Sequence, residues 1–192
     1  MRFIAEAHLA LLFWLLLGMA AKQPGHLQQL FQRAKSSKLA RYALNRALST
    51  LVPFNRAHRV EISKVGDSWV QVLLPYVKQN LNHLKGLHAC ALATACEYST
   101  GVCLFMQLDP GVYRLIMRSM EVDYFYQGKT NALATCQLTP EWITEKVREP
   151  LTQQQEILVT TEAEAFDAEQ NLLCRARISW QIKEWANVKT KV

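Results

Sequence analysis

The segment from residue 86 to residue 108 constrains the fold of this chain most strongly, because Glu97 is the only charged side chain in its 23 residues. A helix that is apolar on nearly every side must be buried on nearly every side. Lys85 and Asp109 bracket the segment and mark where burial should end. The sequence therefore predicts one long helix at the centre of the fold, with the rest of the domain packed around it.

Strand patterns flank this segment on both sides. A hairpin is predicted before it, from residues 60–63 and 69–74, which alternate or are rich in β-formers around a Gly-Asp turn. Four strands are predicted after it, at residues 113–126, 132–139, 157–165 and 172–182. Arg114 and Arg118 interrupt the alternation of the first of these. The order predicts an α+β domain in which an antiparallel sheet wraps around one long central helix.

Charge and cysteine content limit the partners. Residues 1–50 hold seven Lys/Arg and one acid, a net charge of +6, whereas residues 51–192 hold 15 of each. A neutral folded domain without a basic face argues against nucleic acid as a partner. Five cysteines include no C-x-x-C pair, and their odd number argues against a secreted disulfide framework. This cysteine usage fits a reducing compartment, so a cytoplasmic location is expected. No His lies at zinc-ligand spacing with a cysteine, so no metal is expected.

The N-terminus carries an apolar run at residues 7–21 that is shorter than the roughly 20 residues a helix needs to cross a bilayer. Four interpretations stay open: a membrane anchor, a cleaved signal peptide, a docked amphipathic helix, and a chain that starts at Met19. Residues 7–60 contain no acid, and basic residues follow the run. If the run inserts, the positive-inside rule attaches the domain to the cytoplasmic face of a membrane.

We expect three regions along the chain: an apolar segment at 1–24, a basic amphipathic helix at 25–50, and one folded domain at 51–187. The apolar side of the amphipathic helix is predicted to contain Leu27, Leu30, Phe31, Ala34, Leu39, Tyr42 and Ala43. This helix either packs on the domain or binds lipid. Membrane contact through residues 1–46 is therefore one expectation from the sequence.

The stretch NHLKGLHACALATACE, from Asn82 to Glu97, resembles the loop and helix start of the hotdog thioesterase superfamily. In that superfamily an Asn, a Gly and a His precede a central helix that bears an acid nine residues after the His. Asn82, Gly86, His88 and Glu97 stand at these positions. Many members have two glycines directly after the His, whereas this chain has Ala89 and Cys90 there.

The residues SMEVDY at 119–124 and Gly128 also resemble the third strand and turn of that superfamily. The pattern is similar to a largely uncharacterised branch near the phenylacetyl-CoA thioesterases. The resemblance covers about residues 51–185 and implies the hotdog fold, leaving the first fifty residues unexplained.

The resemblance implies an enzyme that hydrolyses acyl-CoA or acyl-carrier thioesters. It also implies a homodimer with the active site at the interface, a tetramer being left open, and no cofactor beyond the coenzyme A of the substrate. Two alternatives stay open. One is a non-catalytic acyl-thioester-binding or scaffold module at the membrane, which the Ala89-Cys90 departure keeps open. The other is an acyl-thioester dehydratase or hydratase on the same fold.

Thioester hydrolysis needs a base or nucleophile, donors for the developing oxyanion, and a slot for the acyl chain. On a helix, Cys90, Thr94, Glu97 and Gly101 fall within about 60° of one another, so small groups surround the only carboxylate. Glu97 would act either as nucleophile or as general base, and burial should raise its pKa. Gly86, Thr94 and Gly101 are expected to line the substrate site.

The helix start is expected to supply the other groups. The N–H groups of Ala89 and Cys90 should point outward unpaired and bind the oxyanion. His88 and Asn82 would orient the carbonyl or the attacking water, with helix capping and a plain turn as their structural alternatives. Coenzyme A phosphates attract cations, and the candidates are Arg114, Arg118, Lys129, Arg175 and Arg177.

Overall fold

The structure is a computed structural model that describes residues 26–188, so the apolar segment predicted at 1–24 lies outside the described residues. The strands are β1 (Glu61–Val65), β2 (Trp69–Leu74), β3 (Tyr113–Tyr124), β4 (Ala132–Gln137), β5 (Glu156–Phe166) and β6 (Leu172–Glu184). The longer helices are α2 (His26–Ala34), α3 (Lys38–Leu51), α4 (Pro53–His58) and α5 (Ala89–Gln107). Short helical turns are η1 (Lys78–Asn80), α6 (Pro140–Ile143), η2 (Thr144–Arg148), α7 (Glu149–Leu151) and η3 (Trp185–Asn187).

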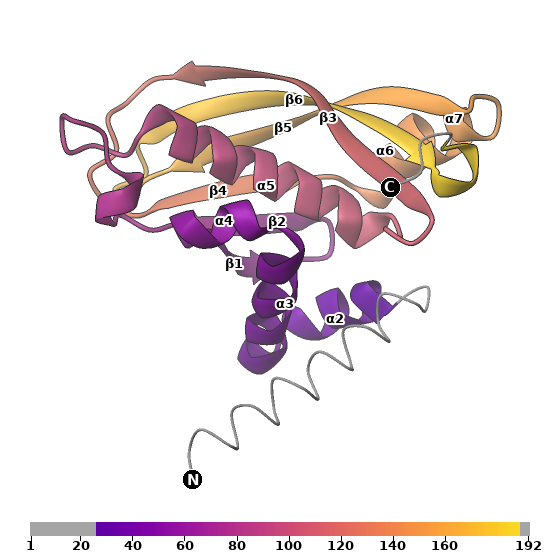
Figure 1. The fold of residues 1–192 in the computed structure, drawn as a ribbon, viewed down its shortest axis with the longest axis horizontal. Helices are drawn as coiled ribbons and strands as arrows, with labels where there is room; N and C mark the ends of the chain where they lie inside the picture. The colour runs from indigo at the N-terminus through magenta and orange to yellow at the C-terminus, as the bar shows by residue number, and fades with distance from the viewer. Residues whose placement is uncertain (1–25, 189–192) are drawn as a thin grey trace, which may run out of the picture.

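The six strands form one antiparallel sheet in the order β1-β2-β4-β5-β6-β3. The sheet curves around α5, which packs mainly against β2, β4, β5 and β6 and contacts β3 less than these four strands (Figure 1). α5 is long and apolar enough to cross a membrane, but 72% of it is buried inside the fold, as expected for a core helix. The predicted α+β architecture, the hotdog arrangement of a sheet around a central helix, is confirmed.

Strand β3 explains why its sequence pattern looked irregular. Met117 pairs with Trp180 and Ser119 pairs with Ser179, so Arg118 is the extra residue of a β-bulge. A bulge shifts the alternation by one residue, which is the disturbance seen in the sequence. The rest of the strand keeps its register with β6.

The amphipathic helix expected at residues 25–50 is divided into α2 and α3. Ser37 caps α3, its Oγ accepting a hydrogen bond from the Ala40 N–H at 3.2 Å. Serine competes for backbone hydrogen bonds and favours such caps over helix interiors. The break changes the helical phase, so Leu39 and Tyr42 do not continue the apolar side of α2. They are exposed, while Leu44, Ala47 and Leu48 face the core instead.

The two edges of the sheet are covered differently. At β1, Asn45 of α3 pairs with Ile62: its Nδ2 donates to the Ile62 oxygen at 3.0 Å, and the Ile62 N–H donates to its Oδ1 at 2.8 Å. At the other edge, β3 runs for 12 residues, and no described strand pairs with its outer side. A long uncovered edge is a template for pairing with another chain.

Candidate active site at the start of the central helix

The start of α5 is held in place by three neighbouring segments. The Leu87 N–H donates to the Gly128 oxygen, and the His88 N–H donates to the Asn80 oxygen, both at 2.8 Å. Asn80 is fully buried, and its Nδ2 donates to the His58 oxygen at 2.8 Å. The β3–β4 loop, η1 and α4 therefore fix the position of the helix start. Asn80 was not predicted as a site residue, because its burial arises only in the folded chain.

His88 caps α5 through its side chain. Its Nδ1 accepts a hydrogen bond from the Cys90 N–H at 3.1 Å, so the expectation that this N–H is unpaired is wrong. Because Nδ1 is the acceptor, a neutral ring carries its proton on Nε2. His88 is exposed, which leaves that Nε2–H free to meet a ligand. Among residues 26–188, no protein group accepts the Ala89 N–H, so this amide keeps its predicted availability.

The loop before the helix is organised by Asn82. Its Oδ1 accepts the N–H of Leu84 at 2.9 Å and the N–H of Gly86 at 3.0 Å, so this oxygen has the turn role that was the structural alternative. Gly86 allows Gln127 to lie over the loop, since a Cβ there would come within 2.7 Å of the Gln127 Cγ. Asn82 and Gly86 thus shape the approach to the helix start.

The helix face predicted to carry the chemistry is the more open face of the first half of α5. Cys90 is exposed, Thr94 and Glu97 are half-buried, and Gly101 is buried. A Cβ at Gly101 would lie 3.1 Å from the Trp180 ring, so this glycine makes room for Trp180. The stripe is therefore open at its N-terminal end and closed by Trp180 at its C-terminal end.

Glu97 is a carboxylate without a protein partner. No hydrogen bond or ion pair to its side chain exists within residues 26–188. The enclosed polar atoms that lack a partner belong to Gln28, Asn55 and Arg114, so the Glu97 oxygens still reach solvent. Burial raises the pKa of Glu97 above its ordinary value. The Glu97 carboxylate is thus accessible to water, and it binds a proton more tightly than an exposed glutamate does.

An apolar wall from β3 stands beside this stripe. The residues of β3 that face the helix side pair with Trp180, Ile178, Ala176 and Cys174 of β6, all of which are buried. Their own exposure is higher: Met117 is 43% exposed, Met120 37% and Tyr124 46%. α5 therefore leaves this wall partly uncovered.

Tyr124 joins the wall to the helix start and was missed as a site residue. Its hydroxyl donates to the Ala89 oxygen at 2.9 Å. Burial raises the pKa of Tyr124 to about 12, so the hydroxyl keeps its proton at neutral pH. The sequence offered one indication of this role. Tyr124 lies near the end of the strand predicted at residues 113–126, at a position whose side chain falls on the inner face of the sheet.

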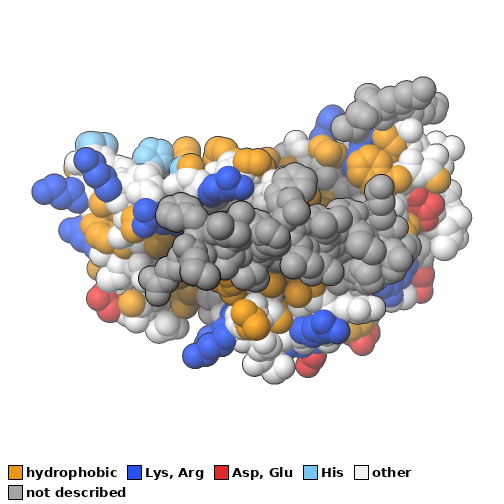
Figure 2. All heavy atoms as spheres, turned by 60° about the horizontal axis from the view of Figure 1, so that its bottom comes forward, with side chains coloured by type: hydrophobic (Ala, Val, Ile, Leu, Met, Phe, Trp, Pro, Cys, Tyr) orange, Lys and Arg blue, Asp and Glu red, His pale blue; other side chains and the backbone are white. Residues whose placement is uncertain are grey.

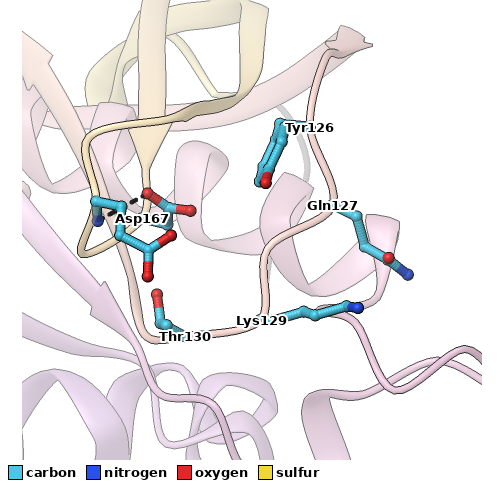
Figure 3. A pocket seen from close by; sticks show the side chains of 6 residues that line it. Tyr126, Gln127, Lys129, Thr130 and Asp167 are labelled. Atoms are coloured by element: carbon cyan, nitrogen blue, oxygen red, sulfur yellow. Dashed lines mark hydrogen bonds between the residues drawn. The ribbon is translucent and has the colours of Figure 1, made fainter.

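A hollow of about 400 Å³ lies between the β3–β4 loop and the β5–β6 turn, and Glu97 is not among the residues that line it. Figure 3 shows Tyr126 and Thr130 facing it, while Gln127 and Lys129 extend away. Burial raises the pKa of its Asp167, but hydrogen bonds from Asn171 and Glu169 outweigh this effect and hold the pKa below its usual value. A hollow with two carboxylates and one nearby cation is poorly suited to phosphate groups.

The Arg and Lys residues predicted to bind coenzyme A phosphates differ in whether a protein group already pairs with them. Arg175 pairs with Glu164 at 2.6 Å, and Arg177 pairs with Glu121 at 3.1 Å. Arg114 is half-buried and donates to Gln181 at 3.4 Å. Within residues 26–188, the exposed Arg118 at the β3 bulge has no carboxylate partner, which leaves it and Lys129 as the free cations of the set. No group of three potential metal ligands occurs in the described part of the chain.

Comparisons with known proteins agree with this architecture. A family model described as "Domain of unknown function (DUF4442)" matches residues 40–182. A Pseudomonas aeruginosa protein described as a probable thioesterase has a similar structure, with a TM-score of 0.65 and 16% identity over 73% of this chain and 93% of that one. A Haemophilus influenzae thioesterase is similar with a TM-score of 0.58 and 13% identity, over 73% and 90% of the two chains. No curated protein matches in sequence. At these identities the structural likeness establishes the fold.

Proposed function

Because the chain belongs to the family of the domain of unknown function DUF4442 and has the hotdog fold, we propose that it hydrolyses acyl thioesters, with acyl-CoA as the substrate class. The proposal rests mainly on one observation: the half-buried carboxylate of Glu97 has no hydrogen-bond or ion-pair partner within residues 26–188, and burial raises its pKa. A half-buried carboxylate with no partner costs stability, and such groups concentrate at functional sites. The fold is shared with proteins described as thioesterases.

In the proposed reaction, Glu97 takes a proton from a water molecule that attacks the thioester carbonyl. The raised pKa of Glu97 makes it a better base near neutral pH. The developing oxyanion is stabilised by the Ala89 N–H and by the Nε2–H of His88. The carbon–sulfur bond then breaks, and the leaving thiolate takes up the proton that Glu97 removed from the water. The products are a carboxylic acid and a free thiol, and Glu97 is again a carboxylate.

The helix geometry supports a site shared between two copies of the chain. Ala89 and Glu97 are eight residues apart, which places them about 12 Å apart along an α-helix. One thioester carbonyl cannot meet both groups of the same helix. We therefore propose a dimer in which Glu97 of one protomer faces the helix start of its partner. The uncovered edge of β3 is the surface that would pair the two sheets.

Residues of β3 near that edge are suited to the acyl chain and to the phosphates of coenzyme A. The half-exposed Met117 and Met120 offer an apolar wall to the acyl chain. Arg118, exposed and without a carboxylate partner within residues 26–188, offers a cation to the phosphates of coenzyme A. Both lie on β3, so acyl chain and carrier would meet at the same edge.

The test uses the full chain and a panel of acyl-CoAs, with release of free thiol as the readout. We expect turnover of at least one substrate and a loss of about 10²-fold to 10⁴-fold in kcat on Glu97→Gln, the range typical of general-base catalysis. Glu162→Gln is the matched control, because Glu162 is an exposed glutamate on β5. Binding of acyl-CoA without thiol release would favour the scaffold alternative, and full activity in Glu97→Gln would remove Glu97 from the mechanism.

A further inference from the structure

The outer face of α3 exposes apolar side chains that the fold does not use. Leu39 is 77% exposed and Tyr42 is 63% exposed. At 100° per residue, Lys38, Leu39, Tyr42 and Arg46 lie within about 100° of one another, on the side opposite the buried Leu44, Ala47 and Leu48. We call these four residues the α3 outer face. α3 is thus apolar on two sides, only one of which packs against the domain.

This face lies in a strongly basic region. Residues 26–60 contain seven Lys/Arg and no acid, whereas residues 61–188 contain 11 Lys/Arg and 15 Asp/Glu. Of the seven cations, only Lys35 has a carboxylate partner within residues 26–188, namely Asp67 at 2.8 Å. Figure 2 brings forward the side of the molecule that lies at the bottom of Figure 1. Around the atoms drawn in grey, Lys/Arg and hydrophobic side chains lie next to one another, and the visible Asp and Glu side chains lie toward the margins. The positive charge is therefore largely uncompensated.

Side-chain hydrogen bonds join α2 and α3 to the rest of the domain. Gln28 of α2 donates to the oxygen of Leu108 at 3.2 Å, which satisfies a carbonyl just past the end of α5. Asn45 of α3 pairs with the backbone of Ile62 in β1. Because β1 and β3 are opposite edges of the sheet, a dimer formed through β3 leaves the α3 outer face free.

We propose that the α3 outer face docks the protein on the surface of an anionic lipid bilayer. Helices that lie in the bilayer interface combine exposed apolar and aromatic side chains with cations, as this face does. In sequence, the apolar run of residues 7–21 precedes this region, so two neighbouring segments have lipid-compatible composition.

The experiment measures co-sedimentation of the full chain with vesicles of phosphatidylcholine alone and of phosphatidylcholine with added phosphatidylglycerol. We expect tighter binding to the anionic vesicles, a difference that shrinks at high salt as charges are screened. The double substitution Lys38→Glu and Arg46→Glu should weaken binding to anionic vesicles by about 25-fold or more, from about fivefold per cation removed. Leu39→Ser with Tyr42→Ser should weaken binding to both kinds of vesicle.

The controls are Lys146→Glu, an exposed cation between β4 and β5, and Leu158→Ser, an exposed apolar residue of β5. Both should bind vesicles as the unchanged chain does, and thermal unfolding shows that every variant is folded. Equal binding to both vesicle types, or an anionic preference that survives Lys38→Glu with Arg46→Glu, overturns the proposal. It is also overturned if Leu39→Ser with Tyr42→Ser changes the oligomeric state but not vesicle binding. Thiol release from soluble acyl-CoA is measured separately, so this result does not depend on the proposed activity.

Discussion

At the scale of single residues, the pKa of Glu97 predicts a pH-dependent stability. Burial raises this pKa from its ordinary value of 4.5, so the folded chain binds the Glu97 proton more tightly than the unfolded chain does. The contribution of Glu97 to the stability of the unchanged protein should fall as the pH rises from about 4.5 through the folded pKa of this group. The side chain introduced by Glu97→Gln does not ionise, so the part of the pH dependence that comes from Glu97 should be absent in this variant. We expect the variant to be more stable than the unchanged protein at neutral pH and equal to it at pH 4, by urea denaturation.

The control for this prediction is Glu162→Gln, at an exposed glutamate. Its stability difference from the unchanged protein should be within about 0.5 kcal/mol at either pH. If Glu97→Gln is less stable than the unchanged protein at neutral pH, the carboxylate makes a favourable interaction in the fold. Its assignment as an unpartnered group would then be wrong.

Sequence reasoning predicted which residues share the open face of α5, because that follows from helical spacing. The proposed role of Glu97 rests in addition on the resemblance to the hotdog thioesterase superfamily and stays a prediction. The partners of Asn80 and Tyr124 lie far away in sequence, so their roles could not be deduced. The Cys90 N–H was expected to be free because a helix start has unpaired donors, but the side chain of His88 folds back to cap it.

At the scale of elements, the uncovered edge of β3 predicts that Ile116→Lys weakens the proposed dimer. Ile116 is 48% exposed on the outer face of this edge strand. A lysine there places a charge beside the expected pairing partner, and native edge strands use lysine to prevent such pairing. We expect the dimer dissociation constant to rise by about tenfold, measured by analytical ultracentrifugation.

Leu158→Lys provides a matched control for the edge. Ile116 on β3 and Leu158 on β5 both pair with Gln181 of β6, so the two side chains lie on the same face of the sheet. Leu158 is 63% exposed but lies on an internal strand. Its substitution should leave the dimer intact. Equal dissociation in both variants would show that general surface charge, and not the β3 edge, determines the effect.

The packing of α2 predicts that this helix belongs to the cooperative core. Phe31 is fully buried in the main hydrophobic cluster, whereas Leu39 of α3 is 77% exposed. Phe31→Ala should lower the free energy of unfolding by about 3–5 kcal/mol because it leaves a cavity. Leu39→Ala should change it by no more than about 0.5 kcal/mol. Urea denaturation measures both, and an unchanged Phe31→Ala variant would mean that α2 unfolds separately from the domain.

Helices and strands could be predicted where the apolar residues recur at a clear helical or strand period. β5 and β6 alternate because their outer faces meet solvent, and α5 is apolar all round because the sheet surrounds it. The break between α2 and α3 was missed because the apolar residues recur every three or four positions on each side of it, although the two sets lie about 120° apart on one continuous helical wheel. The turns from Pro140 to Leu151 are too short to show a period, and Pro140 and Pro150 further interrupt it.

At the scale of the whole molecule, the proposed site makes the dimer part of the chemistry. About 12 Å of helix separates Ala89 and His88 from Glu97, so a single chain holds the two halves of the site too far apart for one carbonyl. In the proposed arrangement, neither half of the site can act without the matching half on another copy of the chain. Oligomerisation would therefore control activity directly, and dilution below the dimer dissociation constant should lower the specific activity.

Mixing two defective variants tests this arrangement. Glu97→Gln lacks the base and His88→Ala lacks a donor at the helix start, so each homodimer should be weakly active. If the halves come from different protomers, a mixed dimer has one intact site and one site with both defects. Random re-association gives mixed dimers for half of the population, so activity should recover to about one quarter of the unchanged value. If both groups of a site come from one chain, every site in the mixture keeps a defect, and activity stays at the average of the two parents.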